Sequence, residues 1–192
     1  MKAHVLVPLK RLDRAKSRLS AALTPVEREA LMRALLEGVL DAVRNARVER
    51  ITLVTSEPIV GLVGVEIWHD RGLPWNVALE EAMRELVTEE IATVISADLP
   101  LLAPGDVETL IAATPALGIA IARADDGGTN AVSMRPPALL RTHFGEPGSA
   151  AVHARSAQAR RVEHVIVDRP GLAFDVDTPD DLARIPRTKG AR

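Results

Sequence analysis

The stretch ATVISADLP, residues 92–100, decides the fold class of this chain. Residues 92–96 are predicted as a strand, and their mainly apolar, non-alternating pattern is typical of a strand buried on both faces of a parallel sheet. Ala97 and Asp98 follow this strand, and Pro100 ends the stretch. Because ligands bind at the carboxyl ends of strands in open α/β sheets, the stretch predicts a buried strand with a candidate site residue at its end.

The same pattern recurs on either side of this stretch, with apolar runs separated by segments of helical periodicity. Further strands are predicted at residues 3–7 (stopped by Pro8), 51–54, 64–67, 117–122 and 162–167, with 130–134 ambiguous. Helices are predicted at residues 24–43, 77–87, 104–113, about 136–143, 149–159 and 180–185, with 70–76 as a loop. This alternation predicts a three-layer α/β/α fold with a mainly parallel sheet. We expect a single domain over residues 1–185 and a frayed, basic tail over 186–192.

The composition excludes several classes of protein. The chain has 192 residues, a formal net charge of -2 and no cysteine, so it is not a generally basic nucleic-acid binder and has no thiolate metal site. It contains two Phe, two Trp and no Tyr, which argues against stacked aromatic platforms for bases. The first apolar run is too short for a signal peptide or a membrane span. We therefore expect a cytoplasmic protein with neither nucleic-acid nor membrane partners.

The loop after the first predicted strand, residues 8–18, contains five cationic residues and one acid. Lys10, Lys16 and Arg18 could surround a polyphosphate as charge-assisted donors. The loop matches neither the P-loop pattern nor the dinucleotide fingerprint. A solvated basic loop remains the alternative interpretation.

Asp98 is the second candidate, because a carboxylate at a strand end can hold magnesium over a phosphate. The alternative is that Asp98 caps the helix predicted near Pro104 or closes a turn.

The segment DDGGTN, residues 125–130, is the third candidate. Its two glycines let backbone amides approach an anion, and Thr129 adds a hydroxyl. An ordinary β-turn without a ligand-binding role is the alternative interpretation of the same residues.

The segment FDVDTPDDL, residues 174–182, is the fourth. Alternate carboxylates on an extended segment point to one side, so Asp175 and Asp177 can share a cation. Thr178, Pro179 and Asp181 instead have the pattern of a helix start.

Taken together, these motifs resemble the 2-phospho-L-lactate or phosphoenolpyruvate guanylyltransferase family of coenzyme F420 biosynthesis, within the MobA-like nucleotidyltransferase superfamily. The resemblance runs in order along almost the whole chain, and its most specific parts are the KSRL, GGTN and FG..GS segments. It is carried by residues 7–10, 15–19, 54–56, 96–102, 127–131, 144–145, 148–149, 153 and 175–179. It implies a nucleotide-diphospho-sugar transferase fold, which is Rossmann-like.

The resemblance also implies an activity: transfer of GMP from GTP to the phosphate of phosphoenolpyruvate or 2-phospho-L-lactate, with release of pyrophosphate and with Mg²⁺ bound. 3-Phosphoglycerate is an alternative acceptor. A molybdopterin or sugar-phosphate nucleotidyltransferase and a non-catalytic GTP-binding domain are the alternative functions. The labile product suggests delivery to the downstream transferase of the pathway, and the oligomeric state, monomer or homodimer, is open.

Site residues follow from the same resemblance. Lys16 and Asp98 are expected to be catalytic, and the metal is expected on Asp98 with Asp177 or Asp175. The residues expected to contact GTP are Pro8, Leu9, Lys10, Ser17, Arg18, Thr55, Ser56, Gly72, Asn76 and Ala97. Those expected to contact the acceptor are Thr129, Gly145 or Gly148, and Ser149.

Two segments depart from the family pattern. Residues 72–76 read GLPWN where the family has glycine-leucine-asparagine, which puts a base contact by Asn76 in doubt. Residues 144–149 hold one residue more than usual, which leaves open whether Gly145 or Gly148 faces the acceptor.

Overall fold

A seven-stranded sheet forms the centre of the protein, in the order β3-β2-β1-β4-β6-β5-β7. The computed structural model describes residues 2–12, 16–59, 61–86 and 90–185. The strands are β1 (Ala3–Leu9), β2 (Arg50–Thr55), β3 (Glu66–His69), β4 (Ile91–Ile95), β5 (Gly118–Arg123), β6 (Thr129–Arg135) and β7 (Glu163–Val167). β6 is antiparallel to both of its neighbours, and all other pairs are parallel. The predicted mainly parallel sheet is therefore confirmed.

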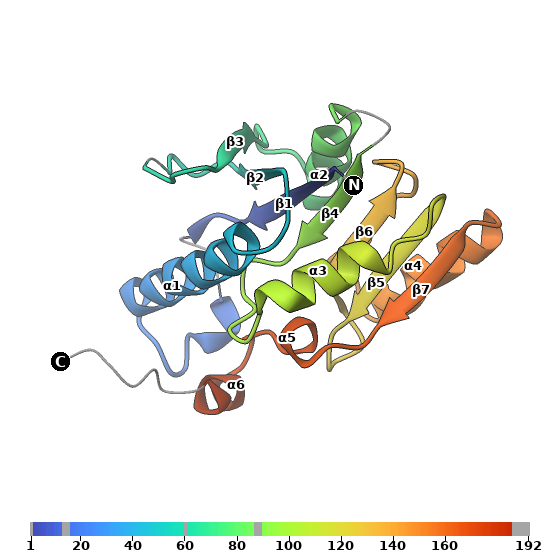
Figure 1. Ribbon diagram of the computed structural model, residues 1–192. Coiled ribbons are helices and arrows are strands. Elements are labelled where there is room, and N and C mark those ends of the chain that lie inside the picture. The colour runs from blue at the N-terminus through green and yellow to red at the C-terminus, as the bar shows by residue number, and fades with distance from the viewer. Residues whose placement is uncertain (1, 13–15, 60, 87–89, 186–192) are drawn as a thin grey trace.

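Helices cover both faces of this sheet, which confirms the three-layer architecture. They are the 3-10 helix η2 (Ser17–Leu19) and the α-helices α1 (Pro25–Arg44), α2 (Trp75–Arg84), α3 (Pro104–Ala112), α4 (Ser149–Ala159), α5 (Pro170–Ala173) and α6 (Pro179–Arg184). α1 and α3 lie over one face, and α2 and α4 lie over the other (Figure 1). Successive residues of a strand point to opposite faces, so Val7 joins the core cluster of Leu40 and Leu110, whereas Leu6 joins that of Leu79.

Two helix starts have the capping geometry that the sequence predicts. Glu27 donates its backbone N–H to Thr24 Oγ1 (3.3 Å), while the Glu27 carboxylate accepts from the Thr24 N–H (2.8 Å). Thr178 and Asp181 form the equivalent capping box at α6. Such reciprocal bonds satisfy backbone donors that have no partner within the helix. Asp181 is thereby assigned a structural role.

Several predicted elements need correction. β1 continues through Pro8 to Leu9. Beyond Leu6 it is paired only with β2, so one side of the strand has no neighbouring strand there, and proline, which lacks an N–H, breaks no hydrogen bond on that side. Residues 136–143 are not a helix: two prolines remove backbone donors, and Ala138 has a φ of 54°, in the left-handed region that ends helical propagation.

The remaining differences concern element boundaries. The ambiguous segment 130–134 lies within β6, and α2 begins at Trp75, inside the segment predicted as a loop. The four-residue α5 has too little periodicity to be predicted from the sequence. Val87, at the end of the predicted helix 77–87, and the expected tail 186–192 lie outside the described residues. In the part of the chain that the structure describes, no helix has both the length and the apolar character needed to cross a membrane.

The antiparallel placement of β6 brings two distant motifs together. Because β6 runs against β4, its first residues lie beside the carboxyl end of β4, with Ala131 paired to Ile95. The backbone N–H of Ser96 donates to the carbonyl of Asn130 (2.8 Å). The segment after β4 and the segment before β6 therefore form adjoining parts of one sheet edge.

Candidate active site

A cavity of about 560 Å³ opens at this edge of the sheet. Its walls come from six segments that are far apart in the sequence. They contribute residues 8–10, residues 16–18, residues 96–98, residues within 124–130, residues 144–149, and Asp175 with Asp177. Single residues from two helices, Met32 of α1 and Trp75 of α2, complete the lining.

Three carboxylates gather at one end of the cavity. Asp98, Asp175 and Asp177 each place one oxygen within 4.8 Å of the other two. Asp98 follows β4, whereas Asp175 and Asp177 lie on the segment between α5 and α6. Asp98 does not cap α3, because the N-cap of that helix is Ala103 and the capping carboxylate is that of Asp106. The carboxylate of Asp98 is thus left for the cavity.

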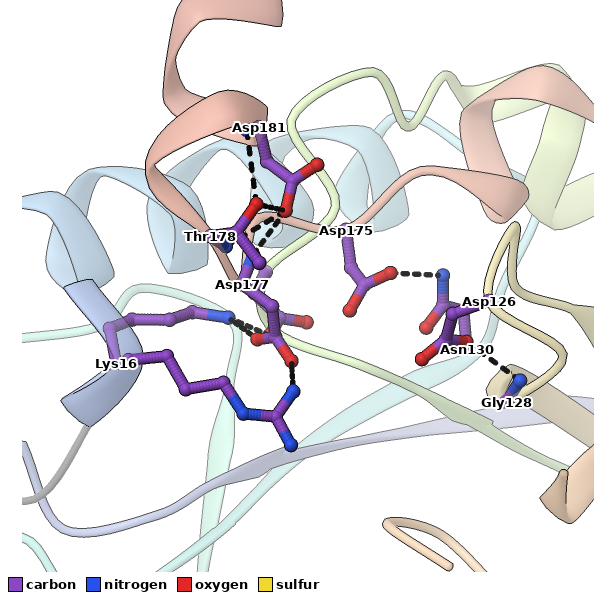
Figure 2. Close-up of polar contacts among 10 residues, drawn as sticks. Lys16, Asp126, Gly128, Asn130, Asp175, Asp177, Thr178 and Asp181 are labelled. Atoms are coloured by element: carbon purple, nitrogen blue, oxygen red, sulfur yellow. Dashed lines mark hydrogen bonds and ion pairs between the residues drawn. The ribbon is translucent and has the colours of Figure 1, made fainter. Parts of the chain in front are cut away.

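Lys16 enters this cluster from the cationic loop. Its Nζ donates to Asp98 Oδ2 and to Asp177 Oδ1, the second at 3.0 Å. Figure 2 shows the lysine reaching Asp177 from one side of the cluster and Asn130 reaching Asp175 from the other. The Lys16 side chain is only 5% exposed, so it is not part of a solvated basic loop. Arg18, 73% exposed, donates to the other oxygen of Asp177 (3.2 Å).

The local backbone explains how Lys16 points inward. Lys16 precedes η2 with a φ of 52° and a ψ of 40°, a left-handed conformation that is uncommon for a residue other than glycine. Leu19 of the same short helix is completely buried. Its backbone N–H donates to the Lys16 carbonyl (2.9 Å). The buried leucine therefore anchors the turn that directs the lysine toward the carboxylates.

The electrostatics of the cluster reflect crowding of like charges. Burial, followed by repulsion from Asp98, raises the pKa of Asp175 to about 6. Burial alone would lower the pKa of Lys16, but Asp98 and Asp177 outweigh it and hold that pKa above its ordinary value. Lys16 is therefore a fixed cation, and it neutralises only part of the negative charge around it.

The donor set fits a hard divalent cation. Magnesium and manganese prefer carboxylate and phosphate oxygens, and three carboxylate oxygens within 4.8 Å of one another provide such ligands. The pKa of Asp175, raised by burial and then by repulsion from Asp98, is consistent with this fit, since a bound cation would favour the charged carboxylate against both effects.

Hydroxyl groups and two glycines form another part of the cavity wall. The Ser149 hydroxyl donates to Thr129 Oγ1 (3.0 Å), and His153 Nδ1 lies 3.1 Å from the same oxygen. Gly145 and Gly148 have φ angles of 78° and 63°, a region in which glycine carries no steric penalty. Gly148 is the N-cap of α4, so the start of this helix faces the cavity.

A second cavity of about 300 Å³ adjoins the first and shares Pro8, Leu9, Lys10 and Trp75 with it. It continues toward β2 and α2, where its lining is mostly apolar and includes Ser56, Asp70 and Gly72. Lys10 Nζ lies 4.2 Å from the centroid of the Trp75 ring, a cation–π contact at the boundary between the two cavities.

Comparison with known proteins bears on what this arrangement does. The family model described as guanylyl transferase CofC like matches residues 3–187. The chain belongs to the CofC-like guanylyl transferase family. It is therefore an enzyme of the nucleotidyltransferase class, and the resemblance inferred from the motifs is confirmed.

Relatives in this family match over nearly their full length. The chain is 38% identical to a phosphoenolpyruvate guanylyltransferase of Rubrobacter xylanophilus, over 100% of this chain and 97% of the relative. It is 33% identical to a 2-phospho-L-lactate guanylyltransferase of Methanothermobacter thermautotrophicus, over 96% of this chain and 84% of the relative.

Solved structures share the fold of this family member at lower sequence identity. A nucleotidyl transferase from Methanothermobacter thermautotrophicus has a TM-score of 0.69 at 18% identity, covering 96% of this chain and 95% of the other. A Mycobacterium tuberculosis protein in complex with manganese has a TM-score of 0.60 at 21% identity, covering 96% and 97%. At these identities the likeness establishes the fold alone.

Most of the site residues expected from the sequence lie together. The first cavity contains Pro8, Leu9, Lys10, Lys16, Ser17, Arg18, Ala97, Asp98, Thr129, Gly145, Gly148, Ser149, Asp175 and Asp177. Ser56 and Gly72 line the second cavity. The turn predicted for residues 125–130 is also present, closed by the bond from the Gly127 N–H to the Ala124 carbonyl (3.0 Å). The Gly128 N–H donates to Asp126 Oδ1 (2.7 Å), as drawn in Figure 2. That segment is thus both a hairpin turn and a cavity wall.

Two expected nucleotide contacts lie outside the described lining of both cavities. Thr55 is fully buried, and its Oγ1 accepts from the Glu57 N–H (3.0 Å). The Asn76 amide is bonded twice to the backbone of Phe144: its Nδ2 donates to the carbonyl (3.1 Å), and its Oδ1 accepts from the N–H (2.9 Å). In this geometry Asn76 holds the 144–149 loop in place.

Two residues of the cavity wall are not predicted from the sequence. Asn130 Nδ2 donates to Asp175 Oδ1 (3.3 Å) and so orients one of the clustered carboxylates. Trp75 begins α2, within the segment that the sequence predicts as a loop, and lines both cavities.

Proposed function

We propose that this protein transfers GMP from GTP to the phosphate of a small phosphorylated carboxylate, phosphoenolpyruvate or 2-phospho-L-lactate, and releases pyrophosphate. The observation that carries this proposal is a single cavity lined by two chemically different groups of residues. One group is the carboxylate cluster with Lys16, and the other consists of Thr129, Gly145, Gly148 and Ser149. The names of the relatives support the same two acceptors.

The nucleotide would bridge the two adjoining cavities. The apolar second cavity suits a purine base, and the cationic loop at its mouth suits the phosphates. Within that loop, Lys10 is positioned by Trp75, and Arg18 is largely exposed and able to reach a phosphate. Asp70, in the second cavity, offers a carboxylate oxygen that can accept from the N–H groups of guanine, which adenine lacks at the corresponding edge.

The reaction is a displacement at the α-phosphorus of GTP. An acceptor phosphate oxygen forms a bond to that phosphorus, the bond to the α,β-bridging oxygen breaks, and pyrophosphate leaves with the bonding electrons. The acceptor phosphate is already largely ionised near pH 7, because its second pKa is about 6, so no protein base has to remove a proton. The task of the protein is to align two anions and to stabilise charge as it shifts to the leaving group.

Lys16 and the carboxylates divide this task. Asp98 with Asp177, or with Asp175, would hold Mg²⁺ or Mn²⁺, and such a cation supplies charge neutralisation and orientation of the phosphates when bound. Lys16 then presents its ammonium group to the α-phosphate, and its raised pKa keeps that group charged at neutral pH. Asn130 keeps Asp175 turned toward the cluster.

At the wall formed by Thr129, Gly145, Gly148 and Ser149, the acceptor would be held by hydroxyl and backbone groups. Thr129 is the hydroxyl donor that faces the acceptor, and the two left-handed glycines allow the 144–149 loop to approach it closely. We infer that both Gly145 and Gly148 belong to this wall, since both line the cavity.

We infer a place for this reaction in coenzyme F420 biosynthesis in the cytoplasm, with a downstream transferase taking the labile product. The nucleotidyltransferase domain is inferred to span residues 1–185. The acceptor choice is supported by the cavity chemistry and by the names of the relatives together.

The test measures pyrophosphate release with Mg²⁺ and GTP against phosphoenolpyruvate, 2-phospho-L-lactate and 3-phosphoglycerate. ATP and CTP serve as nucleotide controls, and a downstream transferase is added to trap the product. We expect release with GTP and one of the first two acceptors, together with a new diphosphate signal in ³¹P NMR. Release only with 3-phosphoglycerate, a sugar phosphate or a molybdopterin would reassign the acceptor. GTP binding without release under any acceptor would favour a non-catalytic GTP-binding domain.

A further inference from the structure

His153 is a buried titratable residue that the proposed reaction does not use. It lies on α4 and is 1% exposed. The rings of Phe144 and His143 pack edge-on against it, with centroids at 5.7 and 5.3 Å. Its two ring nitrogens contact different partners on opposite sides, and these partners determine which nitrogen carries the proton.

The backbone fixes which nitrogen carries the proton. The N–H of His143 donates to His153 Nε2 (2.9 Å). A nitrogen that accepts a hydrogen bond carries no proton, so the proton of the neutral ring lies on Nδ1. Burial, followed by the charge of His143, lowers the pKa of His153 to about 4, against the opposing effects of the Ser149 backbone and Glu146. The ring is therefore neutral at pH 7.

This tautomer determines the hydrogen bonds of Thr129. His153 Nδ1–H donates to Thr129 Oγ1 (3.1 Å), and the Ser149 hydroxyl donates to the same oxygen (3.0 Å). A hydroxyl oxygen has two lone pairs, and these two donors face both of them, with the Nδ1–H shared between Thr129 and the Ser149 backbone carbonyl. The proton of Thr129 must then be donated to a third group. Thr129 lines the first cavity, so a ligand oxygen there can be that group.

We propose that His153 is a positioning residue that acts through Thr129. By donating from Nδ1, it turns the Thr129 hydroxyl into a donor aimed at an anionic oxygen of the acceptor. The inference rests on the proposed function, in that the acceptor occupies this end of the cavity. If His153 only anchored the 143–149 loop through the His143 N–H, the variants His153→Gln and His153→Asn would show the opposite order of effects.

The first test is the tautomer itself, measured by long-range ¹H–¹⁵N NMR of the wild-type protein at pH 7. The His153 signals are assigned by their loss in the His153→Asn variant. We expect a protonated Nδ1 and an unprotonated Nε2. A protonated Nε2, or a doubly protonated ring, would overturn the proposal. This measurement does not depend on substrate or turnover.

The second test separates the two hydrogen bonds. An asparagine amide nitrogen can take the place of Nδ1 and donate to Thr129, whereas a glutamine amide oxygen can reach the place of Nε2 and accept from the His143 N–H. We expect His153→Gln to raise the KM for the acceptor about tenfold, with kcat and the KM for GTP changed much less. His153→Asn should recover most of this loss. The reverse order, or equal losses, would overturn the proposal.

Two controls complete the design. The same substitutions at His164, on the edge strand β7, control for loss of a histidine. A cycle with Thr129→Val tests whether His153 acts through the threonine: adding His153→Gln to Thr129→Val should cause little further loss. Independent, additive losses would count against the proposal.

Binding is measured without turnover by calorimetry of phosphoenolpyruvate, with a GTP analogue that has a methylene group between the α- and β-phosphorus atoms. Weaker binding in His153→Gln, but not in His153→Asn, is the expected result. If the wild-type enzyme released no pyrophosphate with any acceptor, the proposed function would fail. Inorganic phosphate would then be the binding probe. It should still bind more weakly to His153→Gln than to His153→Asn.

Discussion

Lys16 and Asp177 are separated by 161 residues in the sequence, yet Lys16 Nζ lies 3.0 Å from Asp177 Oδ1. The same ammonium group also donates to Asp98, so one lysine joins the loop after β1 to the segments after β4 and α5. The lysine therefore pairs with two of the carboxylates that would hold a metal and neutralises part of their charge. A divalent cation and Lys16 compete for the same oxygens, and the lysine becomes available to a phosphate when the cation binds.

This competition makes a prediction for Lys16→Met. Without the ammonium group, the three carboxylates repel one another with no internal cation, so Mn²⁺ should bind the nucleotide-free protein about tenfold more tightly. The rate of pyrophosphate release should nevertheless fall on the order of a hundred- to a thousandfold, as for loss of a preorganised charge. Calorimetry with Mn²⁺ measures the first effect, and steady-state kinetics measure the second. Weaker Mn²⁺ binding in this variant would contradict the competition.

Asp98→Asn is expected to abolish measurable turnover and to leave the protein folded. The substitution keeps the shape of the side chain but removes a charge that both the metal and Lys16 require. Asp168→Asn is the matched control, because Asp168 is an exposed aspartate whose ion pair among the described residues is with the exposed Arg123. Pyrophosphate release and the midpoint of thermal unfolding are measured for both. A near-normal rate in Asp98→Asn would exclude the proposed role.

Asn76→Ala tests what Asn76 does. Because both ends of its amide bond the backbone of Phe144, its loss should loosen the 144–149 loop. We expect the KM for the acceptor to rise severalfold, with much less change in the dissociation constant for GTP. These constants are measured by kinetics and by equilibrium binding. The opposite pattern, weaker GTP binding with an unchanged acceptor KM, would support the nucleotide contact expected from the sequence.

His4 predicts how stability depends on pH. It is buried on β1, where its Nε2 lies 2.7 Å from Thr52 Oγ1 of β2. Burial, followed by the charge of Arg50, lowers its pKa to about 4. The unfolded chain has the ordinary value of about 6.5, so it binds a proton before the folded chain does. This contribution to stability is complete above pH 6.5 and is lost as the pH falls through 4.

We therefore expect the free energy of unfolding to fall by about 2 to 3 kcal/mol between pH 7 and pH 4 on account of His4. Urea denaturation at several pH values measures the slope. His4→Gln, which retains a polar group near Thr52, should reduce the pH dependence in this range. His164→Gln, on the edge strand, should leave the slope as in the wild type. An unchanged slope in His4→Gln would show that another group is responsible.

Much of the fold could be predicted from local sequence signals. The continuous apolar run before Asp98 and the capping residues Thr24 and Thr178 each specify their own element, since burial and capping depend on a few neighbouring side chains. The helix expected at residues 136–143 was wrong because its periodicity was outweighed by two prolines and by the left-handed Ala138.

The site was predictable as a set of residues but not as an arrangement. The motifs named Lys16, Asp98, Asp175 and Asp177, yet nothing in their spacing states that one ammonium group lies among the three carboxylates. The spacing of the motifs likewise does not predict that the Asn76 amide is bonded to the backbone of Phe144. Contacts between such distant residues depend on strand order and on the crossing of loops, which local patterns do not encode.

The sequence by itself determined the alternation of strands and helices, the family and the chemical character of the site, because these depend on residue types and on short spacings. The tertiary structure decided which groups meet. The antiparallel direction of β6 places Asn130 beside the end of β4, and the turn before η2 directs Lys16 inward. The proton position on His153 was likewise decided by a backbone N–H from another segment. Each of these outcomes depends on the direction of a group in space, and direction is fixed only when the whole sheet has formed.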